Sequence, residues 1–404
     1  MTTSTPVTPA ARPSIPRGIW ALGFVSMFMD VSSEMIHSLL PIYMVTVLGT
    51  STLAVGIIEG IAEATASIVK VFSGALSDRL GKRKLLAVVG YGLGAFTKPV
   101  FPMAGGLEAL VGARFVDRVG KGIRGAPRDA LVADLAPPEV RGASYGLRQS
   151  LDTIGAFSGP LLAVALMWLF ANDFQAVFWV AVIPAFLSVA ILMAGVQEPA
   201  HPAGRRPARI PLRRRELAQL GHPYWMVVAV AAVFTLARFS EAFLLLRAQE
   251  LGVPAFSIPL VLVLMGLAYS VSSYPAGVLS DRMDRTRLLG AGMVLLALAD
   301  IALALASNLA VAAVGVVLWG LHMGFTQGVI AALVADASPK ELRGTAFGVL
   351  NLVTGVALLL ASVAAGGLWE AFGSAATFLV GAGLAVASLV VLGLARSARP
   401  GTSA

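Results

Sequence analysis

The stretch RFVDRVGKGIRGAPRDALVADLAPPEVRGASYG, residues 114–146, holds two features from which the architecture of this chain follows. Its charged side chains fall three or four residues apart, so an α-helix would gather them on one face. They are Arg114, Asp117, Arg118, Lys121, Arg124 and Arg128. Its second part, residues 130–146, recurs in diverged form as residues 332–348. The first feature predicts charge inside an otherwise apolar region, and the second predicts a chain built from two copies.

Composition places the chain among polytopic membrane proteins. Of its 404 residues, 57% are hydrophobic and only 13% are charged, whereas charged residues make up about 25% of a typical soluble protein. Cysteine is absent, which excludes disulfides and thiolate metal sites. Residues 1–16 lack the apolar core of a signal peptide, so we expect a short disordered cytoplasmic tail there. Residues 397–404 are expected to form a similar tail.

Apolar segments of about 20 residues, long enough to cross a bilayer as helices, recur along the whole chain. We predict twelve spans, at residues 17–46, 51–77, 84–104, 107–134, 141–170, 174–196, 223–247, 256–280, 288–306, 309–335, 342–368 and 373–395. The long hydrophilic connection is residues 197–222, which are rich in proline and arginine. It divides the chain into an N-terminal half, residues 17–196, and a C-terminal half, residues 223–396.

The distribution of positive charge predicts the orientation of the spans. Lysine and arginine are concentrated after spans two, four, six, eight, ten and twelve, while the alternate connections are short and carry little positive charge. Cytoplasmic loops carry the excess of Lys and Arg, so both termini are expected in the cytoplasm of a multi-pass protein of the cell (inner) membrane. Because the net charge of +8 follows these loops, it is no sign of a nucleic-acid partner.

Two separate segments repeat at almost the same distance along the chain. Residues 74–84, GALSDRLGKRK, return as residues 277–287, GVLSDRMDRTR, a shift of 203 positions. The sequence ALVAD at residues 130–134 returns at residues 332–336, a shift of 202 positions. Chance similarity between apolar helices would not give two such similar shifts. The copies have the same orientation, so we expect them to face each other across an axis along the membrane normal.

At residues 74–84 the chain resembles the major facilitator superfamily of secondary transporters, whose G-x-L-a-D-r-x-G-r-k-r loop this segment matches closely. The second copy departs from the pattern at Asp284, where the first has Gly81. The resemblance covers residues 17–396. It implies an all-α membrane protein with two six-helix bundles, a central cavity and rocking alternating access.

The repeated loop also predicts an ion-pair latch that closes the cytoplasmic face and breaks during the cycle. Its glycines would let helices approach closely, and its acidic and basic side chains would pair with neighbouring loops. The candidate latch residues are Gly74, Asp78, Arg79, Arg141, Gly277, Asp281, Arg282 and Arg343. The alternative interpretation is charge that only orients the loops.

Many charged residues fall inside the expected spans, where each costs about 2.5–3.5 kcal/mol at mid-bilayer on insertion scales. Such a number cannot face lipid, so we expect these side chains to face a wet cavity or one another. The candidate cavity residues are His37, Glu59, Glu63, Arg114, Asp117, Lys121, Arg148, Asp152, Arg238, Glu241 and His322. The alternative for Arg148 with Asp152, and for Arg238 with Glu241, is a structural pair within one helix. Lys98 and Asp300 lie in spans that are usually peripheral in the resembled fold, which favours a structural role.

Asp30, Glu34 and Arg118 are the candidates for proton coupling. The two carboxyl groups lie four residues apart in span one, so a helix places them on one face. Arg118 opens the sequence RVGKG, which resembles the R-x-x-q-G element linked with proton coupling in the superfamily, although Arg114 competes for this alignment. Residues 155–160, GAFSGP, resemble the G-x-x-x-G-P element of exporters, but the glycine pair expected after the proline is absent.

These features favour proton-coupled efflux of a small or drug-like solute by a monomer that needs no cofactor. The alternatives are transport of an anionic solute such as an organic anion or siderophore, and efflux of nickel, cobalt or iron through Asp30, Glu34, His37 and His322. A transporter-like receptor is a further class, against which the dense intramembrane charge argues. An enzyme is not expected, because the sequence contains no soluble domain, P-loop or nucleophile elbow.

Overall fold

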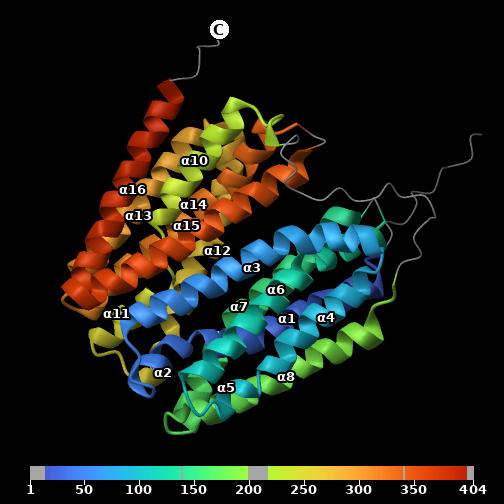
Figure 1. Cartoon of the computed structure of the whole chain (residues 1–404), viewed down its shortest axis with the longest axis horizontal. Coiled ribbons are helices and arrows are strands. Elements are labelled where there is room, and N and C mark those ends of the chain that lie inside the picture. The colour runs from blue at the N-terminus through green and yellow to red at the C-terminus, as the bar shows by residue number, and fades with distance from the viewer. Residues whose placement is uncertain (1–13, 138–139, 199–216, 340–341, 398–404) are drawn as a thin grey trace, which may run out of the picture.

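The computed structural model describes residues 14–137, 140–198, 217–339 and 342–397, and these residues form helices without any strand (Figure 1). The first half contains α1 (Arg17–His37), α2 (Leu40–Thr46), α3 (Thr52–Leu80), α4 (Arg83–Thr97), α5 (Val100–Met103), α6 (Leu107–Leu135), α7 (Arg141–Leu169) and α8 (Phe174–Gly195). The second contains α10 (His222–Leu236), α11 (Ala242–Glu250), the 3₁₀ turn η2 (Ala255–Ser257), α12 (Leu260–Arg282), α13 (Arg285–Ala304), α14 (Leu309–Ala337), α15 (Arg343–Phe372) and α16 (Ser374–Ser397).

Within the described residues, ten helical segments are long and apolar enough to cross a membrane. The fourth expected span corresponds to α6, which is long enough but carries too many charged residues to count among the ten. The seventh corresponds to α10 and α11, which are separated by five non-helical residues. All twelve expected positions are therefore helical, and twelve membrane crossings remain a prediction.

Three of the expected spans are interrupted. In the first, α1 ends before Ser38 and α2 begins with a proline in its first turn. In the third, Pro99 separates α4 from α5 because it has no N–H to continue the helical hydrogen bonds. In the seventh, residues 237–241 leave the helix without any proline or glycine. The expectation that Arg238 and Glu241 form a pair within one helix is therefore wrong, because both lie in this break.

The helices of each half pack against one another, and the two halves contact each other along α3 and α15 (Figure 1). Glycines allow this contact to be close: a Cβ at Gly56 would lie 2.2 Å from the backbone oxygen of Ser362, and one at Gly366 would lie 2.6 Å from that of Thr52. The short elements α2 with α11, and η2 with α7, add contacts between the halves at the side opposite the end of α8 and the start of α10. Below, the side at which α8 ends and α10 begins is called the linker side.

Within the first half, α1 packs tightly against α7. A Cβ at Gly155 would lie 2.4 Å from the backbone oxygen of Met27, and one at Gly159 would lie 2.8 Å from the Cβ of Glu34. The small residues of 155–160 therefore permit close packing of the two helices. The sequence GAFSGP thus brings α7 directly against the face of α1 that carries Glu34.

Candidate functional site

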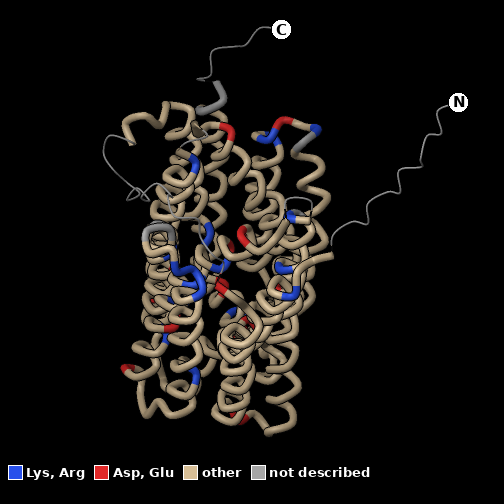
Figure 2. Tube along the Cα trace, turned by 90° about the vertical axis from the view of Figure 1, so that its right-hand side faces the viewer, with Lys and Arg blue, Asp and Glu red and all other residues tan. Residues whose placement is uncertain are grey.

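A cavity of about 190 Å³ lies between the two halves. Its wall includes three carboxylates, three Lys or Arg side chains and one imidazole, so it is polar and nearly balanced in charge. The lining residues are Glu34, His37, Glu63, Arg118, Lys121, Arg238, Phe239, Ser240, Glu241 and Leu358. Figure 2 shows that acidic and basic residues occur along the helices as well as at their ends. Seven of the residues expected from the sequence therefore meet around one space.

His37 links the cavity to a buried ion pair. Its Nδ1 lies 3.2 Å from Oε2 of Glu34, whose side chain is 24% exposed, and its Nε2 lies 3.7 Å from Oε2 of Glu59, which is fully buried. Arg114 donates from Nη2 to the same oxygen of Glu59 at 2.7 Å. The four side chains form a chain that runs from the cavity wall into the interior of the first half.

Arg118 and Glu63 form a second pair at the cavity wall, with Nη1 3.1 Å from Oε1. Arg118 is nearly buried, while the side chain of Glu63 is 30% exposed. The guanidinium therefore meets the cavity mainly through its carboxylate partner. Lys121, one turn further along α6, lines the same wall.

Asp117 lies behind this wall rather than on it. Nζ of Lys98 donates to Oδ1 of Asp117 at 2.9 Å and to Oγ of Ser33 at 3.1 Å, and both charged side chains are almost completely buried. These contacts tie α6 to the break between α4 and α5 and to α1. The expectation of a structural role for Lys98 agrees with this geometry, and Asp117 is its partner.

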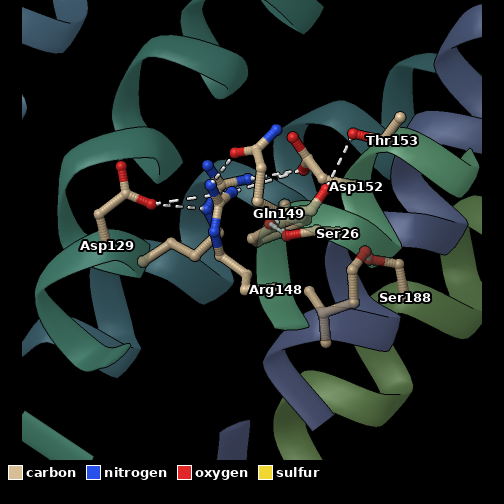
Figure 3. Close-up of polar contacts among 10 residues, drawn as sticks. Ser26, Asp129, Arg148, Gln149, Asp152, Thr153 and Ser188 are labelled. Atoms are coloured by element: carbon tan, nitrogen blue, oxygen red, sulfur yellow. Dashed lines mark hydrogen bonds and ion pairs between the residues drawn. The ribbon is translucent and has the colours of Figure 1, made fainter. Parts of the chain in front are cut away.

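Arg148 and Asp152 belong to a separate cluster between α6, α7 and α1, shown in Figure 3. Nη1 of Arg148 lies 3.5 Å from Oδ1 of Asp152 and 3.9 Å from Oδ1 of Asp129. Arg128 contacts the same two carboxylates at 3.4 Å and 3.2 Å. The expected pair between Arg148 and Asp152 is present, but it is part of a four-residue network outside the cavity wall. Asp30 faces Asp152 in this region and does not line the cavity.

The second half contributes to the cavity through the non-helical residues 237–241. The backbone N–H of Ser240 donates to Oγ of Ser362 in α15 at 3.1 Å, and Oγ of Ser240 accepts from the N–H of Ala242 at 3.3 Å. Phe239 was not among the candidate cavity residues, because an aromatic side chain in an apolar span favours a packing or lipid-facing role, yet it lines the cavity. The sequence signal was present, since Arg238 and Glu241 flank it within an apolar span, but hydropathy does not register a local break.

His322 lies outside the cavity. It is fully buried in α14, where its ring meets Trp319 and Phe234 edge to face at centroid distances of 5.4 Å and 6.2 Å. In the part of the chain that the structure describes, no three His, Asp or Glu side chains are arranged to hold a metal ion. The ligand set suggested for metal efflux is thus divided between the cavity, the network of Figure 3 and this aromatic cluster.

The expected latch residues lie at the linker side, and its described ion pairs are formed within each half. Arg83 pairs with Asp134 in the first half, and Arg285 pairs with Asp336 in the second. Arg343 donates to the backbone oxygen of Ala335 at 3.2 Å. The side chains of Asp78, Arg79 and Asp281 lie outside the described residues, and those of Arg141 and Arg282 are exposed. A latch between the halves remains a prediction.

The two glycines of the repeated loop differ. A Cβ at Gly74 would lie 3.3 Å from the Cβ of Ala126, so this glycine does allow α3 to approach α6 closely. Among the described residues, a Cβ at Gly277 would meet nothing within 4 Å. The prediction of close packing is confirmed for Gly74 and wrong for Gly277.

In the part of the chain that the structure describes, many apolar helices and a charged cavity between two halves are typical of a multi-pass membrane transporter. The sequence matches the family described as Major Facilitator Superfamily over residues 22–247 and 233–404. The chain belongs to this superfamily, as the resemblance at residues 74–84 predicted.

Relatives and solved structures agree on this placement. The chain is 31% identical over 386 residues to an uncharacterized MFS-type transporter of Methanocaldococcus jannaschii, covering 93% of this chain and 94% of the relative. It is 30% identical over 162 residues to the multidrug resistance protein MdtH of Photorhabdus laumondii, covering 40% and 39% of the two chains. A solved structure of a POT family transporter in complex with a thioalcohol conjugated peptide has a TM-score of 0.79, with 13% identity and coverage of 94% and 95%. This last likeness concerns the fold alone.

Proposed function

We propose that the protein is a proton-coupled exporter of a small solute that works by alternating access. The observation that carries the proposal is the position of His37 between Glu34, at the cavity wall, and Glu59, in the interior. An imidazole that contacts two carboxylates can accept a proton at one nitrogen and release one from the other. The partial match to a multidrug resistance protein supports export as the direction.

In this proposal Glu34 exchanges a proton with the cavity, and His37 distributes the charge between Glu34 and Glu59. Arg114 holds Glu59 in place through the 2.7 Å contact, so the inner end of the chain is fixed while the outer end faces the solute. Entry of a solute or closure of the cavity changes the surroundings of Glu34 without moving Glu59. Asp30 remains a second candidate carrier because it faces Asp152 across the α1–α7 contact.

The test uses purified protein in liposomes with an imposed pH gradient, a panel of solutes, and a dye that reports lumenal pH. We expect a subset of solutes to drive proton movement in the wild type, and we expect this coupling to disappear in Glu34→Gln and His37→Gln. Glu108→Gln and His222→Gln are matched controls, since both side chains are exposed and lie outside the cavity. Full coupling in a double Asp30→Asn, Glu34→Gln variant would refute the proposal.

One observation favours an anionic solute as the second candidate. Lys121 and Arg238 line the cavity, and neither forms an ion pair among the described contacts. A carboxylate or phosphate group of a solute could contact both cationic side chains, which come from opposite halves. Such a contact would draw the two halves together. In the same liposome assay this candidate predicts stimulation by anions alone, and loss of that stimulation in Lys121→Ala or Arg238→Ala.

A further inference from the structure

Asp300 is a fully buried carboxylate in the second half for which the structure shows no partner. Among the described residues, neither of its oxygens has a hydrogen-bond partner and none forms an ion pair with it. An ionised carboxylate in such surroundings is very costly, so a buried acid without partners is most stable when it holds a proton. His322, one helix away in α14, is equally buried, and among the described residues neither of its ring nitrogens has a side-chain hydrogen-bond partner.

Comparison of the two halves shows which residue occupies the position where Asp300 would have a partner. The pairs Arg83 with Asp134 and Arg285 with Asp336 fix a shift of 202 positions between the copies of these helices. At this shift Asp300 corresponds to Lys98, and Trp319 corresponds to Asp117. In the first half the two side chains form a 2.9 Å ion pair. The second half retains an ionisable group at the first position but has an indole in place of the counter-ion.

Phe239 lies between Asp300 and the cavity. A Cβ at Gly381 would lie 2.6 Å from Oδ2 of Asp300 and 3.1 Å from Cε1 of Phe239, so the carboxyl group and the ring meet at this glycine. Phe239 itself lines the cavity and is 5% exposed. Its ring packs against those of Trp319 and Phe378 at centroid distances of 5.4 Å. Because Phe239 is the ring that lines the cavity, it separates the carboxyl group from cavity water.

The backbone that carries Phe239 is connected to the contact between the halves. It belongs to residues 237–241, which have left the helix, and its neighbour Ser240 is held by the hydrogen bond to Ser362 in α15. The backbone oxygen of Ser362 is in turn the closest neighbour of Gly56 in α3, at the contact between the halves. Rocking of α15 against α3 would therefore pull directly on the segment that places the ring.

We propose that Asp300 is a second proton-binding group of the transporter, and that Phe239 gates its access to the cavity. The inference rests on the proposed proton coupling. When the ring swings aside, cavity water takes the proton from the Asp300 carboxyl group and leaves a carboxylate, and the reverse step restores the O–H bond. The titratable and charged groups on the surrounding elements include His322 from α14 and Arg238 and Glu241 from residues 237–241, while residues 374–394 of α16 contribute none. Arg247 from α11 is a further cation, which donates to the backbone oxygen of Leu303, one turn beyond Asp300 on α13.

The first test is infrared difference spectroscopy of the reconstituted full-length protein between acid and alkaline pH. We expect a protonated-carboxyl band that disappears in Asp300→Asn and that shifts slowly after transfer to heavy water. Phe239→Leu should speed this shift by about tenfold or more, because exchange then needs less local opening. Phe378→Leu is the matched control, since Phe378 contacts Phe239 from α16 without lining the cavity.

Persistence of every carboxyl band in Asp300→Asn overturns the proposal. If the carboxyl band shifts fast in the wild type and equally fast in Phe239→Leu, the proposed gate is overturned.

The second test measures transport and separates this inference from the proposed function. In liposomes, Asp300→Asn should abolish solute accumulation driven by a pH gradient while retaining exchange of solute for solute without a gradient. Unchanged gradient-driven accumulation in Asp300→Asn overturns the coupling role, even if the band belongs to Asp300. Absence of gradient-driven accumulation in the wild type would instead refute proton coupling itself, and the infrared result would still decide whether Asp300 binds a proton behind Phe239.

Discussion

The ion pair between Glu59 and Arg114 allows a quantitative prediction about stability. The contact is 2.7 Å long, and the two side chains are 0% and 2% exposed. Oε1 of Glu59 and Nε of Arg114 have no further partner. Removing one partner leaves a buried charge, which costs about 3–5 kcal/mol in proteins. We therefore expect Arg114→Met and Glu59→Leu each to lower the free energy of unfolding by about 3–5 kcal/mol.

The double variant should be far more stable than the two single variants together suggest. Replacing a whole buried pair by apolar side chains of similar volume is often neutral or stabilising by about 1–4 kcal/mol. The interaction energy of the double-mutant cycle should thus be several kcal/mol. Lower pH should reduce the cost of Arg114→Met, because protonation removes the charge of a Glu59 that has lost its guanidinium partner and keeps only the 3.7 Å contact with His37. It should not reduce the cost of Glu59→Leu.

The assay is equilibrium unfolding by dodecyl sulfate in mixed micelles, followed by tryptophan fluorescence. Glu250→Gln is the control: its carboxylate contacts Arg247 at a similar distance of 2.8 Å but is 47% exposed, and Arg247 keeps three other acceptors. Such a half-exposed pair should contribute less than about 1 kcal/mol. Additive effects of Glu59→Leu and Arg114→Met, or single effects as small as that of the control, would refute the reasoning.

Three further predictions follow from the packing. Gly155→Val should cost about 1–3 kcal/mol or more in thermal or detergent unfolding, because its Cβ would lie 2.4 Å from a backbone oxygen of α1. Gly146→Ala in the same helix meets nothing within 4 Å and should be neutral or stabilising by about 0.5–1 kcal/mol; equal losses would contradict the packing. Arg83→Gln should destabilise by about 3 kcal/mol and Arg285→Gln by less than about 1 kcal/mol, since the second pair is much more exposed; the reverse order in thermal unfolding would contradict this. Ser362→Ala should cost about 1–3 kcal/mol in detergent unfolding by removing the acceptor for a buried N–H, and an unchanged midpoint would argue against the anchor of residues 237–241.

Much of the fold follows from properties that the sequence displays directly. The length of the apolar segments predicts long helices, and the two nearly equal repeat shifts predict a duplicated chain. Both predictions are robust because each rests on many residues together. The pattern GAFSGP predicts close helix packing because only a missing Cβ permits it, and Gly155 confirms this. Gly277 shows the limit of such reasoning, since a glycine with nothing within 4 Å has no packing role that its surroundings reveal.

The site was less predictable, because spacing along a helix does not say which neighbouring helix a side chain meets. Arg118 and Arg148 both read as charges inside spans, yet one pairs with Glu63 at the cavity and the other joins the network with Asp129 and Asp152. The break at residues 237–241 also escaped prediction. No proline or glycine marks it, and its hydrogen bond to Ser362 joins residues 122 positions apart.

The two copies have kept the same scaffold and diverged in their interior. At the shift of 202 positions, the pair of Arg83 with Asp134 recurs as Arg285 with Asp336, so the linker-side ends of both halves are held alike. At the same shift, four charged residues of α6 correspond to uncharged residues of α14: Arg114 to Val316, Asp117 to Trp319, Arg118 to Gly320 and Lys121 to Met323. The second half has therefore replaced a charged helix face by an apolar one. Asp300 lies behind that face without a counter-ion, and such a buried ionisable residue lowers the stability of the fold. The proposed role of Asp300 as a gated proton-binding group explains why an ionisable residue is present there.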